Sequence, residues 1–194
     1  MVHRTKLAKG FTVAQYERAR DAKNVEALAD FIKCRFEDRY LVPAGVDRPS
    51  DDSIHGFTMM AIACLSIETL QAFYDGLPDT RGQSAAMFLG FFANVELAGE
   101  LKVFNGNEWF YPDIRCGILH QAETRNGWRI LRCGPLLDKP GRTINARKFL
   151  DGLRESVHLY AGLLKTDPSR LEKFHSKMAG MVENCVAHEN LLEK

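Results

Sequence analysis

The chain has 194 residues, of which 45% are hydrophobic and 26% are charged, a balance that supports one well-packed core. The formal net charge is only +1, which excludes binding to nucleic acid through a strongly basic overall field. Any contact with RNA or DNA therefore requires a local cluster of basic side chains.

Residue patterns in the first two thirds of the chain predict four helices. Apolar residues recur with helical spacing from residue 12 to residue 40. A loop containing Pro and Gly follows at 42–53. Residues 56–74 are apolar on nearly every helical face, which places this helix at the centre of the core. Two further apolar helices are expected at 84–97 and 109–124.

After these helices the periodicity changes. Residues 126–145 contain an Asn-Gly turn and two short apolar stretches, which predict a small β-hairpin. Asn145 has the side chain of an N-cap and precedes a helix at 146–165. Asp167 or Ser169 then begins a terminal helix that continues almost to the end of the sequence.

Together the elements predict an all-α fold, a helical bundle with one small β-hairpin after the helix at 109–124. We expect an N-terminal helical extension at 1–50 that packs on the core. The bundle itself is expected at 51–165 with its hairpin at 126–145, followed by a C-terminal helix at 166–194. No internal repeat interrupts this order.

The stretch FYPDIRCGILHQAET places two chemically active side chains among apolar neighbours. Arg115 and His120 lie five positions apart, and a charge in such surroundings requires a partner or a role. An ideal helix turns positions five apart by about 140°, so their convergence requires long side chains or a distortion, which Gly117 permits. A second pair with the same spacing, Arg170 and His175, lies in a charged segment and is expected to form a solvated face.

The sequence FYPDIRCGILHQAETRNGWRI, with the later TINARKFLDGL, resembles the HEPN superfamily, the higher eukaryote and prokaryote nucleotide-binding domains. The resemblance covers about 53–165 and is most specific at 111–128. It implies an all-α bundle of four or five helices with an R-x4-6-H motif near the start of a late helix. It also implies a dimeric, metal-independent endoribonuclease of toxin–antitoxin or phage-defence systems, in which Arg115 and His120 are the catalytic pair.

One residue departs from the family pattern. Active members commonly have a polar residue after the motif arginine, whereas this chain has Cys116. The alternative is therefore a non-catalytic HEPN-like module that binds RNA, a nucleotide or a protein partner. A purely structural Arg–His pair is the third possibility.

The chemistry of RNA cleavage suits the two side chains of the motif. Histidine titrates near neutral pH and can take the proton of a 2′-hydroxyl or donate one to the leaving oxygen. Arginine keeps its charge and binds phosphate oxygens through two donors. The expected product is a 2′,3′-cyclic phosphate, and DNA is expected to be inert.

Several other residues are candidates for supporting roles at the site. Glu68 is the one acid on the apolar helix at 56–74. It is a candidate to pair with Arg115 or to orient His120. The alternative, which the sequence favours, is a salt bridge or cap at the end of the bundle. Tyr111 and Asp113 precede the motif and could line the same groove.

A basic cluster follows the motif in the sequence. Arg125, Arg129 and Arg132 could form the local RNA-binding patch that the net charge does not provide, although arginines on a hairpin are more often solvated. Trp128 could stack on a base, but core packing is the better interpretation.

Neither a metal nor a cofactor is expected. Cys116 and His120 have the i, i+4 spacing of two metal ligands on a helix, but further ligands at a suitable spacing are missing from the sequence. The longest apolar run, 57–67, is too short to span a bilayer, and the scattered cysteines indicate reduced thiols. These two observations predict a cytoplasmic protein that does not enter a membrane. The resemblance implies in addition a homodimer that binds RNA, with an antitoxin or defence protein as a partner.

Overall fold

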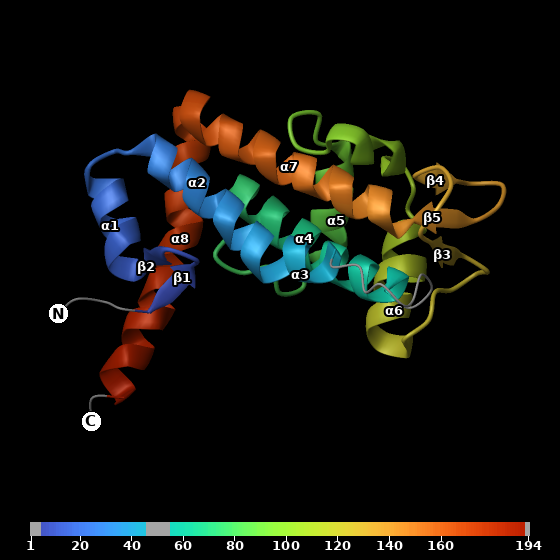
Figure 1. The fold of residues 1–194 in the computed structure, drawn as a ribbon, viewed down its shortest axis with the longest axis horizontal. Helices are drawn as coiled ribbons and strands as arrows, with labels where there is room; N and C mark the ends of the chain where they lie inside the picture. The colour runs from blue at the N-terminus through green and yellow to red at the C-terminus, as the bar shows by residue number, and fades with distance from the viewer. Residues whose placement is uncertain (1–4, 46–54, 193–194) are drawn as a thin grey trace.

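The computed structural model describes residues 5–45 and 55–192, with side chains up to residue 187, and it is mostly helical (Figure 1). The α-helices are α1 (Val13–Asp21), α2 (Val25–Phe36), α3 (Val42–Gly45), α4 (Gly56–Asp75), α5 (Ser84–Ala93), α6 (Cys116–Gln121), α7 (Ala146–Thr166) and α8 (Pro168–Leu192). Two π-helical segments, η1 (Glu37–Leu41) and η3 (Phe110–Arg115), and a 3-10 helix, η2 (Gly99–Phe104), accompany them. The strands are β1 (Lys6–Ala8), β2 (Phe11–Thr12), β3 (Arg129–Leu131), β4 (Leu137–Asp138) and β5 (Thr143–Asn145).

Helix α4 lies at the centre of the bundle, as its apolar sequence predicts. It packs against α5, α7 and α8, and Ile67, Leu70 and Phe73 are fully buried. By length and hydropathy α4 could cross a membrane, but 61% of its most apolar window is buried inside the bundle. This burial is consistent with the core helix of a soluble protein.

The single helix expected at 12–40 is in fact two helices. Thr12 and Gln15 begin α1 with a capping box, in which each side chain accepts a hydrogen bond from the other's backbone N–H. The chain leaves α1 through Lys23, whose φ is 52°, and the Asn24 side chain then caps the first turn of α2. Apolar spacing continues across this break, so periodicity alone does not locate it.

The buried core is continuous from the N-terminal part of the chain to α8. Helix α2 lies along α7, and Phe31 and Phe36 belong to the same buried cluster as Phe73, Tyr160 and Phe174. The division of the chain into three parts stays a prediction. Of the loop expected at 42–53, the first four residues form α3, and the remainder, 46–53, lies outside the described residues.

The three strands that follow α6, β3 to β5, differ from the expected hairpin. Strand β5 lies between β3 and β4 and pairs with β3 in parallel and with β4 antiparallel. The two stretches expected to form a hairpin are β3 and β5, so their predicted antiparallel pairing is wrong. Asn145 caps α7 as predicted, because its side chain accepts hydrogen bonds from the first N–H groups of that helix.

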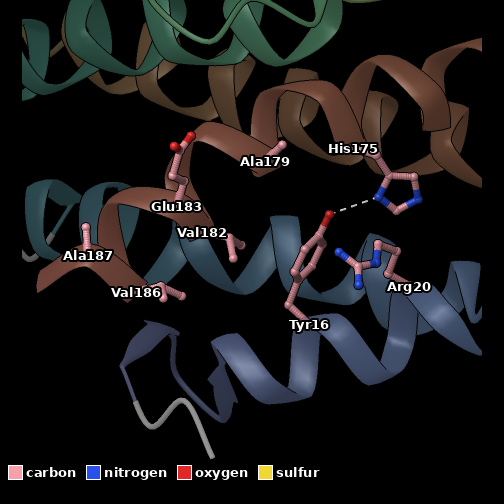
Figure 2. A pocket seen from close by; sticks show the side chains of 8 residues that line it. All are labelled: Tyr16, Arg20, His175, Ala179, Val182, Glu183, Val186 and Ala187. Atoms are coloured by element: carbon pink, nitrogen blue, oxygen red, sulfur yellow. Dashed lines mark hydrogen bonds between the residues drawn. The ribbon is translucent and has the colours of Figure 1, made fainter. Parts of the chain in front are cut away.

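Helix α1 contacts the N-terminal half of α8 through aromatic and polar side chains (Figure 2). The Tyr16 hydroxyl lies 2.9 Å from Nδ1 of His175. Burial lowers the pKa of His175, and the nearby charge of Arg20 acts in the same direction. Burial also raises the pKa of the Tyr16 hydroxyl to about 12. His175 is therefore part of a helix–helix contact.

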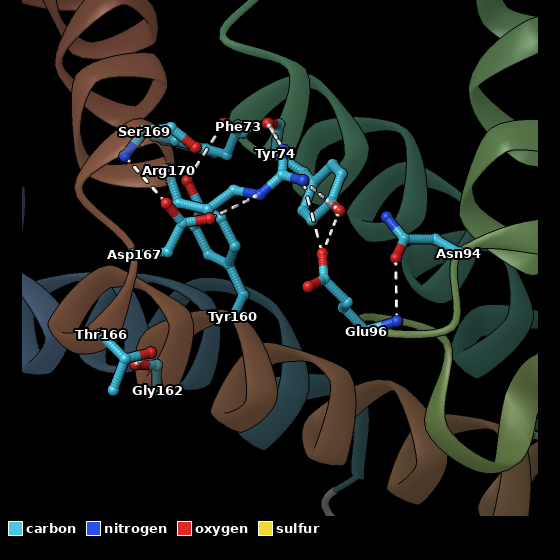
Figure 3. A network of polar contacts seen from close by, with 10 residues as sticks. All are labelled: Phe73, Tyr74, Asn94, Glu96, Tyr160, Gly162, Thr166, Asp167, Ser169 and Arg170. Carbon is cyan, nitrogen blue, oxygen red and sulfur yellow. Dashed lines mark hydrogen bonds and ion pairs between the residues drawn. The ribbon is translucent and has the colours of Figure 1, made fainter.

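Arg170 and His175 are the second Arg–His pair with the spacing of the motif. Arg170 lies in a polar network at the start of α8 (Figure 3). Its guanidinium carbon is 3.5 Å from the ring centroid of Tyr74, and its Nη2 lies 3.4 Å from a carboxylate oxygen of Glu96. The Arg170 side chain is only 16% exposed. The expectation of a solvated face at Arg170 and His175 is therefore wrong, because both side chains join α8 to other elements.

Candidate functional site

A cleft of about 270 Å³ opens between α4, α6 and α8. It contains two side chains that the sequence singled out, Arg115 and Glu68, and His120 contacts Arg115 beside it. The residues that line the cleft are Leu65, Glu68, Thr69, Ala72, Thr80, Arg115, Leu119 and Lys177.

Glu68 holds the guanidinium of Arg115. One carboxylate oxygen of Glu68 lies 3.3 Å from Nη2 of Arg115, and both side chains are largely buried, with 18% and 17% exposed. The other oxygen accepts hydrogen bonds from the hydroxyls of Thr80 at 2.9 Å and Ser84 at 2.8 Å. Of the roles considered for Glu68, the structure has the ion pair with Arg115, and this fixes where the arginine lies.

Arg115 also contacts His120, the other half of the motif. Its Nη1 lies 3.5 Å from Nε2 of His120, whose side chain is exposed. Because the guanidinium can only donate, Nε2 accepts in this arrangement, and a neutral His120 carries its proton on Nδ1. The length of the arginine side chain thus spans the angular separation of positions five apart. An exposed imidazole beside a fixed guanidinium is a suitable arrangement for binding an anion.

The backbone around the motif is irregular on both sides. Arg115 ends the π-helical segment η3, where the N–H of Cys116 donates to the carbonyl of Tyr111, and such segments frequently occur at functional sites. After α6 the chain turns back sharply through Ala122, whose φ is 55°. A Cβ at Gly117 would lie 2.6 Å from the carbonyl oxygen of Glu123. Gly117 therefore permits this close return of the chain, which is a different role from the helix distortion expected.

Two cysteines lie near Arg115. Cys64 is buried one helical turn before Glu68, and burial raises the pKa of its thiol to about 12, against the opposing effect of the Arg115 charge. Cys116, the departure from the family pattern, is partly buried. The charge of Arg115 acts on the Cys64 thiol and has Glu68 as its counterion.

Tyr111 and Asp113 have different positions. The Tyr111 ring lies under Arg115, with 5.4 Å between the guanidinium carbon and the ring centroid. Asp113 is 7% exposed, and its carboxylate accepts a hydrogen bond from the Asn126 side chain at 2.9 Å. Tyr111 thus supports the site, whereas Asp113 joins η3 to the turn after α6 and does not line the cleft.

The arginines that follow the motif lie outside the lining of the cleft. Arg125 donates to the Gln121 side chain at 3.2 Å, and Arg129 donates to the Gly141 carbonyl, also at 3.2 Å. Trp128 stacks on Trp109 with 3.7 Å between ring centroids and is 8% exposed. Core packing, the better interpretation of Trp128, is confirmed.

Three residues at the site were missed by the sequence analysis. Thr80 and Ser84 hold Glu68, and Lys177 lines the far part of the cleft from α8. No local motif marks any of them, since each reaches the site only through the packing of α4, α5 and α8. For Ser84 the sequence shows only that it lies at the start of an expected helix, and it shows no sign that Thr80 or Lys177 belongs to the site.

Other cavities in the described part of the chain are less suited to chemistry. A larger one, of about 550 Å³, lies between α1 and α8 and is mostly lined by Ala and Val beyond Tyr16 and His175 (Figure 2). Cys133 lines a separate cavity with Gly56 and Arg147. Among the described residues, no three His, Cys, Asp or Glu side chains gather as metal ligands would.

A comparison of the chain with family models, with curated proteins and with solved structures finds no match.

Proposed function

We propose that the chain is a metal-independent endoribonuclease of HEPN type that acts as a dimer. The observation that supports this function is the contact between Arg115 and His120 beside a cleft, with Arg115 held in place by Glu68. A role in a toxin–antitoxin or phage-defence system, with a matching protein partner, follows from the family resemblance and is part of the same proposal.

The proposed reaction transfers a phosphoryl group within the RNA. The 2′-oxygen forms a bond to phosphorus while the bond to the 5′-oxygen breaks, which leaves a 2′,3′-cyclic phosphate and a free 5′-hydroxyl. His120 takes the proton of the 2′-hydroxyl or protonates the leaving oxygen, and Arg115 stabilises the charge on the phosphate oxygens. A phosphate bound between the two side chains would replace their present 3.5 Å contact.

Dimer formation has support from two apolar side chains at the cleft. Leu65 and Leu119 both line it, yet they are 43% and 44% exposed. Packing of a second copy against them would remove this apolar surface from water. A second copy packed on them would bring a second His120 to the site, and the two imidazoles could then share the base and acid roles.

The non-catalytic module is the second candidate, and one observation favours it. Arg115 already has a carboxylate partner in Glu68, and its charge is thereby partly neutralised. A site of this kind could bind RNA or a nucleotide without turning it over, in line with Cys116 at the position after the arginine. The two candidates differ in turnover, not in the location of the site.

Three purified proteins separate these candidates: the wild type, His120→Ala, and the control His158→Ala, which removes an exposed histidine of α7. Each is incubated with RNA in EDTA. We expect the wild type and the control to cleave, and His120→Ala to lose at least about 100-fold in rate, the usual contribution of a general acid or base. Since His120 is exposed, its loss should change the stability by less than about 0.5 kcal/mol. Equal cleavage by all three would contradict the assignment, and binding without cleavage by the wild type would favour the module.

A further inference from the structure

Lys177 is the second cation of the cleft, and it comes from a different element than Arg115. It lies on α8, 62 positions after Arg115 in the numbering, and reaches the cleft beside Thr80 and Ala72. Its ammonium donates one hydrogen bond, to the carbonyl of Pro78 at 3.0 Å. Since an ammonium has three donors, two remain available to a ligand.

The charge of Lys177 is not compensated by a salt bridge in the described part of the chain. Arg115 has Glu68 at 3.3 Å, whereas no ion pair within 4.0 Å is found for Lys177 among the described residues. Burial lowers the pKa of Lys177, with Arg35 acting in the same direction and Asp79 opposing. A partly buried cation of this kind gains from an anion that enters the cleft.

The lining of the cleft follows α4 for about two helical turns and carries a net positive charge. Leu65 and Ala72 both line it and are seven positions apart on α4, which corresponds to about 10 Å along the helix. A stacked strand rises by about 3.4 Å per nucleotide. Counting Glu68 as −1 and Arg115 and Lys177 as +1 each, the lining carries a formal charge of +1, which favours a phosphate chain over a neutral ligand.

On the basis of the proposed function, we propose that Lys177 binds an RNA phosphate next to the one held by Arg115 and His120. The cleft then takes at least two adjacent nucleotides of single-stranded RNA, and α8 becomes part of the substrate site. Thr69 and Thr80 also line the cleft, with their hydroxyl protons donated to the carbonyl of Leu65 and to the carboxylate of Glu68. Lys177 is in this account a substrate-binding residue and takes no part in proton transfer.

The test measures binding of a fluorescent 2′-O-methyl RNA of about ten nucleotides, which cannot be cleaved because its nucleophile is blocked, over a series of salt concentrations. The proteins are the wild type, Lys177→Gln, Lys177→Arg and the control Lys102→Gln, which removes an exposed lysine of η2. Loss of one phosphate contact should reduce the slope of log K against log salt by about 0.7 and weaken binding about five-fold at 0.1 M salt. Lys177→Arg should restore both values, and Lys102→Gln should change neither.

The outcomes separate this inference from the proposed function. If the wild type cleaves RNA but Lys177→Gln binds with an unchanged affinity and slope, the role of Lys177 is overturned and the nuclease stands. If the wild type neither binds the probe nor cleaves RNA, both fail. A lower melting temperature of Lys177→Gln without a change in slope would show that the hydrogen bond to Pro78 is only structural, and would also overturn the inference.

Discussion

At the scale of single residues, the site depends on Glu68. Its carboxylate accepts from the hydroxyls of Thr80 and Ser84 and from the guanidinium of Arg115, so one side chain joins α4 to the following loop, to α5 and to η3. A carboxylate has room for about four hydrogen bonds, and three of these are used. The position of Arg115 therefore follows from a residue that itself has no proposed role in proton transfer.

Replacing Glu68 by Gln should destabilise the protein. The variant keeps the shape but removes the counterion of Arg115, whose side chain is 17% exposed. Loss of a partner for a largely buried polar group costs about 1–2 kcal/mol, a decrease that urea unfolding would detect. Glu172→Gln, at an exposed position of α8, is the matched control and should stay within about 0.5 kcal/mol of wild type. Equal stability of the two variants would show that the ion pair contributes nothing.

At the scale of elements, the motif depends on the short unit formed by η3 and α6. The π-helical turn ends at Arg115, α6 continues for six residues, and the chain then returns along Gly117. The return is held by a hydrogen bond from the N–H of Arg125 to the carbonyl of Asp113 at 2.9 Å. Because the two motif residues lie on this unit, its closure determines how they meet.

One glycine replacement tests this closure, and a second, outside the η3–α6 unit, serves as its comparison. In Gly117→Ala the new Cβ would lie 2.6 Å from a backbone oxygen, so we expect a loss of about 1–3 kcal/mol. In Gly162→Ala, within α7, nothing lies within 4 Å of the new Cβ, and the better helix propensity should add about 0.5–1 kcal/mol. Thermal unfolding of both variants would check this. A stable Gly117→Ala protein would mean that the chain can take another path after α6.

At the scale of the whole molecule, α8 links regions that are far apart in the sequence. Its first turns hold the Arg170 network, its middle supplies Lys177 to the cleft, and His175 contacts Tyr16 on α1. Figure 1 shows α8 crossing the end of the bundle beside α1 and the two-stranded sheet. The stability of the contact between α1 and α8 therefore reports whether this end of the molecule is folded.

The stability of this contact should depend on pH. The pKa of His175 lies below its ordinary value of 6.5, mainly because of burial, so below about pH 6.5 the unfolded chain binds a proton that the folded chain resists. The free energy of unfolding should then decrease as the pH falls from 6.5 through the folded-state pKa. His175→Gln should remove this part of the dependence. The free energy of unfolding of both proteins is measured in urea between about pH 5 and pH 7.5. The same pH dependence in both would rule out a contribution from His175.

The sequence predicted the fold where signals are local and failed where they are not. The apolar helix α4 and the helix α7 with its Asn145 cap follow from periodicity and capping. The break at Lys23 and the parallel pairing of β3 with β5 do not, because apolar spacing runs through the first and strand partners are a long-range choice.

The site divides in the same way. Arg115 and His120 were found because they are close in sequence and unusual among apolar neighbours. The pairing of Arg115 with Glu68, 47 residues away, was one of several alternatives. Lys177 could not be found, since only the packing of α8 on α4 brings it to the cleft.

The most direct test of the account is the identity of the ends that the protein leaves on RNA. A short RNA and a DNA of the same sequence are incubated with the wild type in EDTA, and the products are examined by mass spectrometry. The account predicts 2′,3′-cyclic phosphate and 5′-hydroxyl ends on the RNA and an intact DNA, because the nucleophile is the 2′-hydroxyl of the substrate. Cleavage of the DNA, 5′-phosphate ends on the RNA, or no cleavage at all would contradict it.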